Sequence, residues 1–201
     1  MSKERHPIVG VNSKIALWEQ GTDVDHTIDR ELMHKNLLDF KRIAEKHNLT
    51  FTLILGTLLG VIRDKELIAW DDDVDLGVFT ETPGGFTDYY KFGYVLDDLE
   101  REGFHVPDRR YCPWHWITFV RDGQKIDLWM FQKIDNERIY TQVVRYPTHY
   151  FDTLDEVEWL GTTWKTPHNA ESWLEYQYGK NWKTPTKSRG WVLDQRNKER
   201  K

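Results

Sequence analysis

The residues best suited to chemistry form an acidic run at positions 71–75. It contains four aspartates, Asp71, Asp72, Asp73 and Asp75. Carboxylates this close repel one another, so a folded protein keeps them either solvated in a loop or neutralised by a cation. Side chains alternate between the two faces of a strand, so Asp73 and Asp75 would point the same way. We therefore expect a divalent-metal site on a strand.

A Gly-Thr pair precedes this run and is suited to phosphate binding. Gly56 and Thr57 follow an apolar stretch and open a short amphipathic segment that ends at Arg63. A helix starting there presents unpaired N–H groups and its positive dipole end to a phosphate. Gly56 permits a close backbone approach, the Thr57 hydroxyl can donate, and Arg63 can make a bidentate contact. Alone, the pair is a common strand-to-helix turn, and Arg63 suits a surface ion pair equally well.

A third acid, Asp127, lies among apolar residues on a later predicted strand. An Asp-x-Asp strand beside a third strand acid can hold two Mg²⁺ ions about 3.5–4 Å apart, which clamp a phosphate. We predict Asp73, Asp75 and Asp127 as catalytic residues and as ligands of Mg²⁺ or Mn²⁺. Alternatively, Asp127 is an edge charge that discourages sheet pairing. Asp71 and Asp72 are predicted to form a solvated turn.

Three more side chains are candidates for substrate binding. Lys125 either touches phosphate or neutralises the neighbouring acid. His115 either faces the cleft or is a satisfied strand histidine. Trp70 either stacks on a pyrimidine or wedges the acidic loop.

The elements expected to position these residues mix helices with strands in an α+β fold. A helix begins at Asp25, is capped by Asp25 or Thr27, and ends at residues 46–48. An Asp-Gly pair between two aromatic and β-branched runs predicts a hairpin. The other predicted helices cover residues 57–63, 88–102 and 169–178. The predicted strands cover 51–55, 74–79, 104–106, 114–120, 125–131 and 138–146, with a second hairpin at 159–164 and a turn at 83–85.

Composition limits the class of protein. The chain of 201 residues is 39% hydrophobic and 30% charged, which is typical of a globular domain. The net charge of -5, without a long basic run, predicts no nucleic-acid partner. A single cysteine, Cys112, excludes a disulfide framework or a cysteine zinc site within the chain. With no signal-peptide core and no apolar run near ~20 residues, we expect a cytoplasmic protein without a membrane span.

Two longer motifs contain the candidate residues. The first, G-T-L-L-G-x-x-R, begins at Gly56, and the second, W-D-D-D-x-D-x-G, begins at Trp70. A later I-D-L-W sequence contains Asp127, and the end of the chain has a proline, a helix into Tyr-Gly, then Trp and Pro. Over residues 51–185 this order resembles the nucleotidyltransferase fold and, within it, the LicD/fukutin family of phospho-alcohol transferases. The resemblance implies a nucleotidyltransferase-like mixed β-sheet with helices packed on it, as a minimal single domain at 26–185 between a lead-in segment (1–25) and a polar, basic tail (186–201).

The resemblance also implies a function. Family members transfer a phospho-alcohol, such as phosphocholine or ribitol phosphate, from a CDP-activated donor to a glycan or other hydroxyl acceptor, with a divalent metal. Carried over, Asp73, Asp75 and Asp127 would be metal ligands, Gly56 and Thr57 would hold the donor phosphate, and Asp127 would take the acceptor proton. Unlike the animal members, the chain shows no leader, extra domain or cysteine-rich zinc insert, so we expect a minimal catalytic domain.

Three other functions remain alternatives. A nucleotidyltransferase proper would move NMP from an NTP to a hydroxyl of a small molecule or RNA, and it would share the metal site. An Asp-x-Asp glycosyltransferase needs neither the third strand acid nor the Gly-Thr turn. A binding module with a decayed site is disfavoured because all three acids are present.

Overall fold

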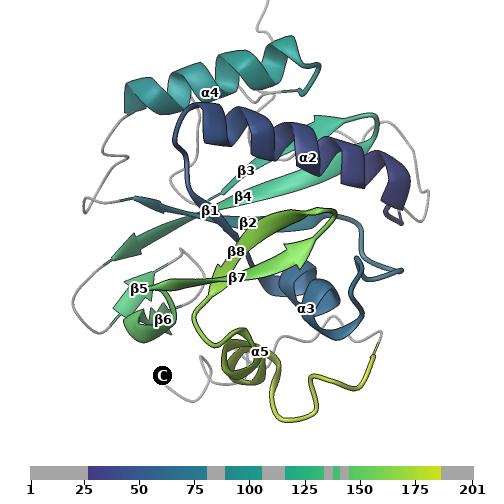
Figure 1. Cartoon of the computed structure of the whole chain (residues 1–201), viewed down its shortest axis with the longest axis vertical. Coiled ribbons are helices and arrows are strands. Elements are labelled where there is room, and N and C mark those ends of the chain that lie inside the picture. Colours follow the sequence, from purple (N-terminus) through teal and green to yellow (C-terminus); the bar gives the residue numbers. More distant parts are fainter. Residues whose placement is uncertain (1–26, 81–88, 106–115, 134–137, 141–144, 187–201) are drawn as a thin grey trace, which may run out of the picture.

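Among the residues that the structure describes, a six-stranded mixed sheet forms the centre of the fold (Figure 1). The computed structural model describes residues 27–80, 89–105, 116–133, 138–140 and 145–186. Strand β2 (Val74–Thr80) pairs antiparallel with β1 (Phe51–Leu53) and parallel with β4 (Gln124–Lys133). Strands β3 (Trp116–Arg121) and β5 (Arg138–Tyr140) pair antiparallel with β4, and β6 (Arg145–Pro147) pairs with β5. A separate two-stranded sheet joins β7 (Leu154–Trp159) to β8 (Thr162–Pro167).

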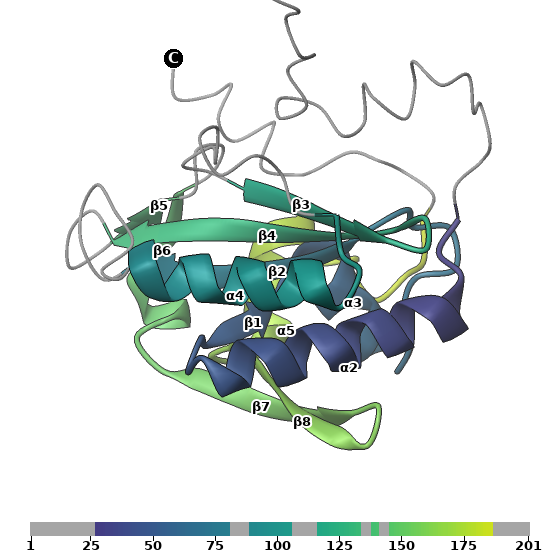
Figure 2. The same cartoon turned by 90° about the horizontal axis from the view of Figure 1, so that it is seen from above.

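Helices cover both sides of the central sheet. Helices α2 (Arg30–Lys46) and α4 (Tyr89–Arg101) lie next to each other in both views (Figures 1 and 2). Asp98 of α4 joins them through ion pairs to Lys46 and to His47, at 2.7 and 2.8 Å. Helices α3 (Leu55–Arg63) and α5 (Ala170–Tyr178) lie on the other side of the sheet in Figure 1. A single 3₁₀ turn, η2 (Thr148–Tyr150), follows β6.

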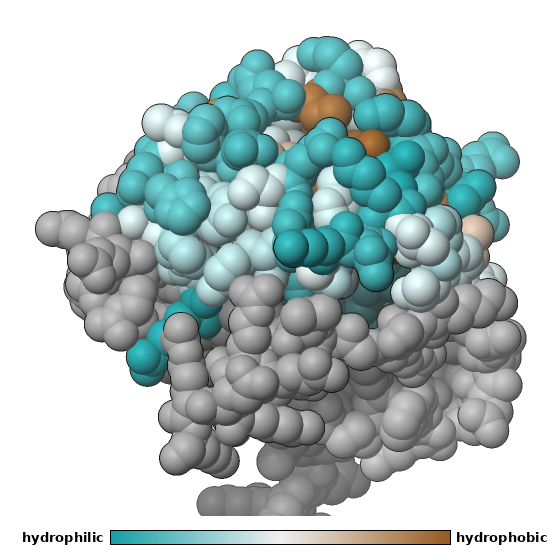
Figure 3. Space-filling view, turned by 90° about the horizontal axis from the view of Figure 1, so that it is seen from below, coloured by the Kyte–Doolittle hydropathy of each residue, from teal (hydrophilic) through white to brown (hydrophobic). Residues whose placement is uncertain are grey.

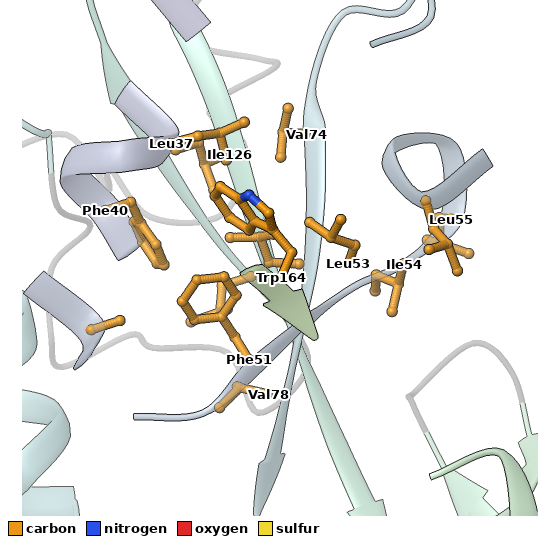
Figure 4. Close-up of a cluster of buried hydrophobic side chains, with 14 of the residues drawn as sticks. Leu37, Phe40, Phe51, Leu53, Ile54, Leu55, Val74, Val78, Ile126 and Trp164 are labelled. Atoms are coloured by element: carbon orange, nitrogen blue, oxygen red, sulfur yellow. The ribbon is translucent and has the colours of Figure 1, made fainter. Parts of the chain in front are cut away.

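A large part of the core lies between α2 and one face of the sheet. Alternate residues of β2 and β4, among them Val74, Leu76 and Leu128, are fully buried because the strand period sends them all to this face. Figure 4 shows Trp164 of β8 inside the same cluster. Its ring lies 6.0 Å from that of Phe51 on β1, so an aromatic contact ties the small sheet to the large one.

Most predicted elements are confirmed, and the differences concern their limits. Helix α2 is capped by Asp29, not by Asp25 or Thr27, because the Asp29 carboxylate accepts the N–H of Leu32. The strand predicted at 51–55 ends at Leu53, since Leu55 turns to φ 48° and starts α3. The strand predicted at 138–146 is divided into β5 and β6, and the one at 104–106 is a single bridge from His105 to Val120.

Both predicted hairpins are confirmed by their turn geometry. Asp122 and Gly123 adopt φ of 52° and 74°, and Leu160 and Gly161 adopt 52° and 70°. These left-handed pairs match the twist of two antiparallel strands. The turn predicted at 83–85 and the lead-in segment lie outside the described residues, as does the tail after residue 186.

The visible surface of the described part is mostly polar on the face shown in Figure 3. Within the described ranges, each helix is too short or too polar to cross a membrane.

Candidate active site

The parallel pairing of β2 and β4 brings two acids together. Asp75 and Asp127 are Cα partners in this register. Their neighbours along each strand, Val74 and Ile126, are buried on the opposite face, against the core. The two carboxylates therefore project from adjacent strands on one face of the sheet, as the strand period requires.

Asp75 lies in a strongly unfavourable electrostatic environment. Burial, then the charges of Asp73 and Asp127, raise its pKa well above the ordinary value. A carboxylate removed from water and facing like charges favours its neutral form. A hydrogen bond from the indole N–H of Trp129 to Asp75 Oδ1, at 2.8 Å, acts in the opposite direction. The charges of Asp73 and Asp127, which were also predicted as metal ligands, therefore act on Asp75.

Asp71 also belongs to this cluster, and it is half-buried where the sequence predicted a solvated turn. Burial, then the charge of Asp73, raises the pKa of Asp71 to about 6. Single carboxylate oxygens of Asp71, Asp72 and Asp73 lie within 4.8 Å of one another. A Cβ added to Gly56 would lie 2.5 Å from Asp71 Oδ2. Asp71 therefore faces the start of α3, and local spacing did not show this because the contact depends on how α3 packs against the loop.

The turn between β1 and α3 places Gly56 next to Asp71 and places Thr57 next to Asp75. Leu55 adopts φ 48°, a left-handed conformation that costs a non-glycine residue about 1–3 kcal/mol. Such strain persists where surrounding contacts enforce it. One such contact is the 2.8 Å hydrogen bond that the Asp75 N–H donates to the buried Thr57 hydroxyl. It ties the first turn of α3 to β2.

The remaining predicted substrate-binding residues have varied surroundings. Lys125 is buried and its Nζ lies 2.7 Å from Asp72 Oδ2. It therefore neutralises Asp72, whereas the sequence suggested that it would neutralise Asp127. Arg63 donates from Nε and one terminal nitrogen to Asp64, at 2.8 and 2.6 Å. Trp70 is exposed immediately before Asp71. His115 lies outside the described residues.

Three residues near the acids escaped the sequence-based prediction. The Thr118 hydroxyl donates to Asp127 Oδ1 at 2.5 Å, and the Trp129 indole donates to Asp75. Tyr178 of α5 has a raised pKa because of burial and then the charges of Asp75 and other groups, so its phenol is near the cluster. One signal was available for Trp129, which follows Asp127 by two residues and so shares its face. The positions of the other two depend on tertiary packing.

The chain matches known proteins over the part that contains these residues. A family model described as "LicD/FKTN/FKRP, nucleotidyltransferase domain" matches residues 48–169. "Ribitol 5-phosphate transferase FKRP" of Homo sapiens is 26% identical over 151 residues, which cover 68% of this chain and 29% of that protein. "Lipopolysaccharide cholinephosphotransferase LicD" of Haemophilus influenzae is 35% identical over 63 residues, which cover 31% of this chain and 24% of that protein.

An uncharacterized protein of Rickettsia prowazekii is 27% identical over 123 residues, 59% of this chain and 41% of that protein. The chain therefore spans less than half the length of these curated relatives. A solved structure of ANT(2")-Ia with adenylyl-2"-tobramycin aligns with 68% of this chain and 69% of that chain, at 13% identity and a TM-score of 0.44. The family match covers more than half of the chain and includes the Gly-Thr corner, the acidic run and Asp127, and the protein belongs to the LicD/FKTN/FKRP family.

Proposed function

We propose that this protein transfers a phospho-alcohol, phosphocholine-like or ribitol-phosphate-like, from a CDP-activated donor to a hydroxyl acceptor on a glycan. We propose Mg²⁺ or Mn²⁺ as the cofactor. Family membership supports the class of reaction, because relatives are named as transferases of ribitol 5-phosphate and of choline phosphate. The named acceptor of one relative, lipopolysaccharide, supports a glycan acceptor.

The observation that carries the proposal is the register of Asp75 with Asp127, beside Asp73 and the start of α3. Their donor set fits a divalent cation, since carboxylate oxygens are the ligands that Mg²⁺ prefers. The fit also rests on the repulsion that raises the pKa of Asp75, which a bound cation would relieve. When bound, such a cation supplies positive charge that neutralises phosphate oxygens during transfer. We propose Asp73, Asp75 and Asp127 as its ligands, with Asp71 nearby.

The start of α3 is the proposed site of the donor phosphates. Its N-cap residue, Ile54, makes no side-chain capping hydrogen bond, so the first-turn N–H groups are not capped by that side chain. These groups and the helix dipole favour an anion, although the Asp71 carboxylate takes up the space beside Gly56. The exposed Trp70 offers an indole face on which the cytosine can stack. We propose that Thr57 and Lys125 contact phosphate and that His115 contacts the donor or the acceptor. Arg63 would have to exchange Asp64 for phosphate.

The proposed transfer is a single displacement at phosphorus. The acceptor oxygen forms a bond to the phosphorus that carries the alcohol, and the bond from that phosphorus to the CMP oxygen breaks. CMP leaves with the bonding electron pair, and the acceptor proton passes to Asp127. Transfer of a nucleotide from an NTP would release pyrophosphate instead.

The test measures which product is released. The purified protein is incubated with Mg²⁺ and labelled CDP-choline, CDP-ribitol or an NTP, with a panel of glycan acceptors. We expect acceptor-dependent release of CMP, its loss on adding EDTA, and its recovery with excess Mg²⁺. Pyrophosphate release from NTPs would support the nucleotidyltransferase alternative, and activity with nucleotide sugars alone would overturn the proposal.

We also propose a cytoplasmic setting. The single cysteine is compatible with it.

A further inference from the structure

Asp75 and Asp127 each accept a hydrogen bond from an uncharged side chain of the same sheet. The Trp129 indole N–H donates to Asp75 Oδ1 at 2.8 Å. The Thr118 hydroxyl donates to Asp127 Oδ1 at 2.5 Å. Both bonds join neighbouring strands, because Trp129 on β4 reaches the acid on β2 and Thr118 on β3 reaches the acid on β4.

The sheet register places each donor within hydrogen-bonding distance of its acid. Thr118 and Asp127 are Cα partners across the antiparallel β3–β4 pair, so their side chains meet directly. Trp129 is the partner of Gly77, two residues beyond Asp75 on the same face. The large indole can therefore lean back along β2 to the carboxylate. Both donors thus belong to paired strands, which hold a side chain more precisely than a loop does.

An uncharged donor suits a carboxylate that must bind a cation. A hydrogen bond to one oxygen limits rotation of the carboxylate and opposes the repulsion that would turn the two acids apart. The donor adds no positive charge, so it does not compete with a metal ion. Asp72 is different, because its carboxylate is paired with the ammonium group of Lys125.

We infer that Trp129 and Thr118 are positioning residues, which hold Asp75 and Asp127 in the orientation that binds the divalent cation. This inference rests on the metal site of the proposed function. Outer-shell partners of metal ligands typically contribute about 10–100-fold to metal affinity. The I-D-L-W sequence then has two roles, because it supplies one acid and the donor that orients the other.

The test is the affinity of the full chain for Mn²⁺, measured by calorimetry or by the EPR signal of the free ion. Trp129→Phe removes the indole donor and keeps an aromatic ring, and Thr118→Val removes the hydroxyl and keeps the shape. We expect each variant to bind Mn²⁺ about 10–100-fold more weakly. Thr118→Ser restores a hydroxyl and should recover most of the affinity.

Matched controls remove the same kind of donor away from the acids. The indole of Trp164 donates to the Trp159 carbonyl at 2.8 Å in the core. The hydroxyl of Thr163 donates to Glu158 at 2.5 Å in an exposed hairpin. Trp164→Phe and Thr163→Val should keep wild-type Mn²⁺ affinity. The rise in Tm on adding Mn²⁺ should likewise shrink in the two site variants and persist in these controls.

Two results would overturn the inference, and they are distinguishable. If wild type binds Mn²⁺ and the folded Trp129→Phe and Thr118→Val proteins match it within twofold, the positioning role is wrong and the metal site stands. If wild type does not bind Mn²⁺, the proposed metal site fails and takes the inference with it. If circular dichroism shows that Trp129→Phe does not fold, the comparison of Thr118→Val with Thr118→Ser tests the positioning role.

Discussion

Asp75 lies where burial and neighbouring carboxylates disfavour its charged form. Its pKa is raised by burial and by Asp73 and Asp127, and in folding it must approach both. Bringing these carboxylates together therefore costs folding free energy. A bound cation would replace the repulsion between the carboxylates with attraction to its positive charge. Asp71 shares the conflict to a smaller degree.

Replacing Asp75 by Asn should separate stability from activity. Without metal, the loss of repulsion should leave the Tm equal or raise it by about 2–4 °C per kcal/mol gained. Metal-dependent turnover should fall by about a hundredfold or more, because a ligand of the cation is lost. Asp73→Asn should behave alike. Differential scanning calorimetry and the CMP-release assay measure the two effects.

The control for this pair is Asp152→Asn. Asp152 is exposed and lies 3.4 Å from Lys133 in a surface ion pair, so both Tm and turnover should stay close to wild type. Full activity in Asp75→Asn or Asp73→Asn would show that the metal assignment is wrong.

The pKa of Asp71 predicts how stability depends on pH. It is raised from 3.8 to about 6, so between these values the folded protein holds a proton that the unfolded chain has lost. The contribution of Asp71 to the free energy of unfolding therefore falls as the pH rises from 4 to 6 and levels off above. The raised pKa of Asp75 adds a further decline above the ordinary range of a carboxyl group.

Urea unfolding of the metal-free protein between pH 4.5 and 7 measures this dependence. The difference in unfolding free energy between wild type and Asp71→Asn isolates the contribution of Asp71. Wild type should lose stability relative to Asp71→Asn as the pH rises to about 6. Saturating Mg²⁺ should cancel that trend, because the cation binds the ionised carboxylates. A difference that does not change with pH would contradict the raised pKa of Asp71.

At the scale of elements, the corner between β1 and α3 governs the shape of the site. The 2.8 Å bond from the Asp75 N–H to Thr57 fixes α3 to β2, and Gly56 leaves the space in which Asp71 lies. The left-handed Leu55 makes this tight turn possible. A side chain at Gly56 would fill the space that Asp71 occupies, so a substitution there tests how this corner shapes the site.

Gly56→Ala should damage the site more than the fold. The added methyl would lie 2.5 Å from Asp71 Oδ2, so Asp71 must move, and we expect at least tenfold weaker Mn²⁺ binding and lower turnover. Gly93→Ala on α4 is the matched control, because a Cβ there meets nothing within 4 Å. It should stabilise the protein by up to about 1 kcal/mol through helix propensity. Wild-type Mn²⁺ affinity in Gly56→Ala would contradict the close approach of Asp71.

At the scale of the whole molecule, a buried arginine joins three parts of the chain on the far side of the sheet from the acids. The guanidinium of Arg121 donates to Asn36 Oδ1 at 2.7 Å and to Asp39 Oδ2 at 2.6 Å, both on α2. It also donates to the Glu102 carbonyl, just after α4, and lies 4.2 Å from the ring centre of Phe104. Arg121 is three residues from Thr118 on β3, so it faces the opposite side of the sheet.

Arg121→Ala should therefore lower stability without changing the site. The loss leaves Asp39 and Asn36 without this donor, and we expect about 2–4 kcal/mol of destabilisation in a urea titration. Mn²⁺ affinity, measured well below the melting temperature, should match wild type. Arg101→Ala is the control, since the Arg101 side chain is 72% exposed and its ion pair contributes little. A changed Mn²⁺ affinity in folded Arg121→Ala would show that the two faces are coupled.

Local patterns in the sequence predict most of the helices and strands, and they single out Asp73, Asp75 and Asp127 as candidate ligands. The Asp-x-Asp spacing, the Gly-Thr pair and the Asp122-Gly123 hairpin each depend on neighbours a few residues away, and so the alternation that puts Asp75 opposite Val74 was predictable. Long-range packing sets the parallel pairing of β2 with β4, which puts Asp75 beside Asp127, and it sets the half-buried Asp71 against the start of α3. It also decided that Thr118 meets Asp127. The physical reason is that register, burial and hydrogen bonds between distant strands depend on packing across the whole fold, and no local period encodes that packing.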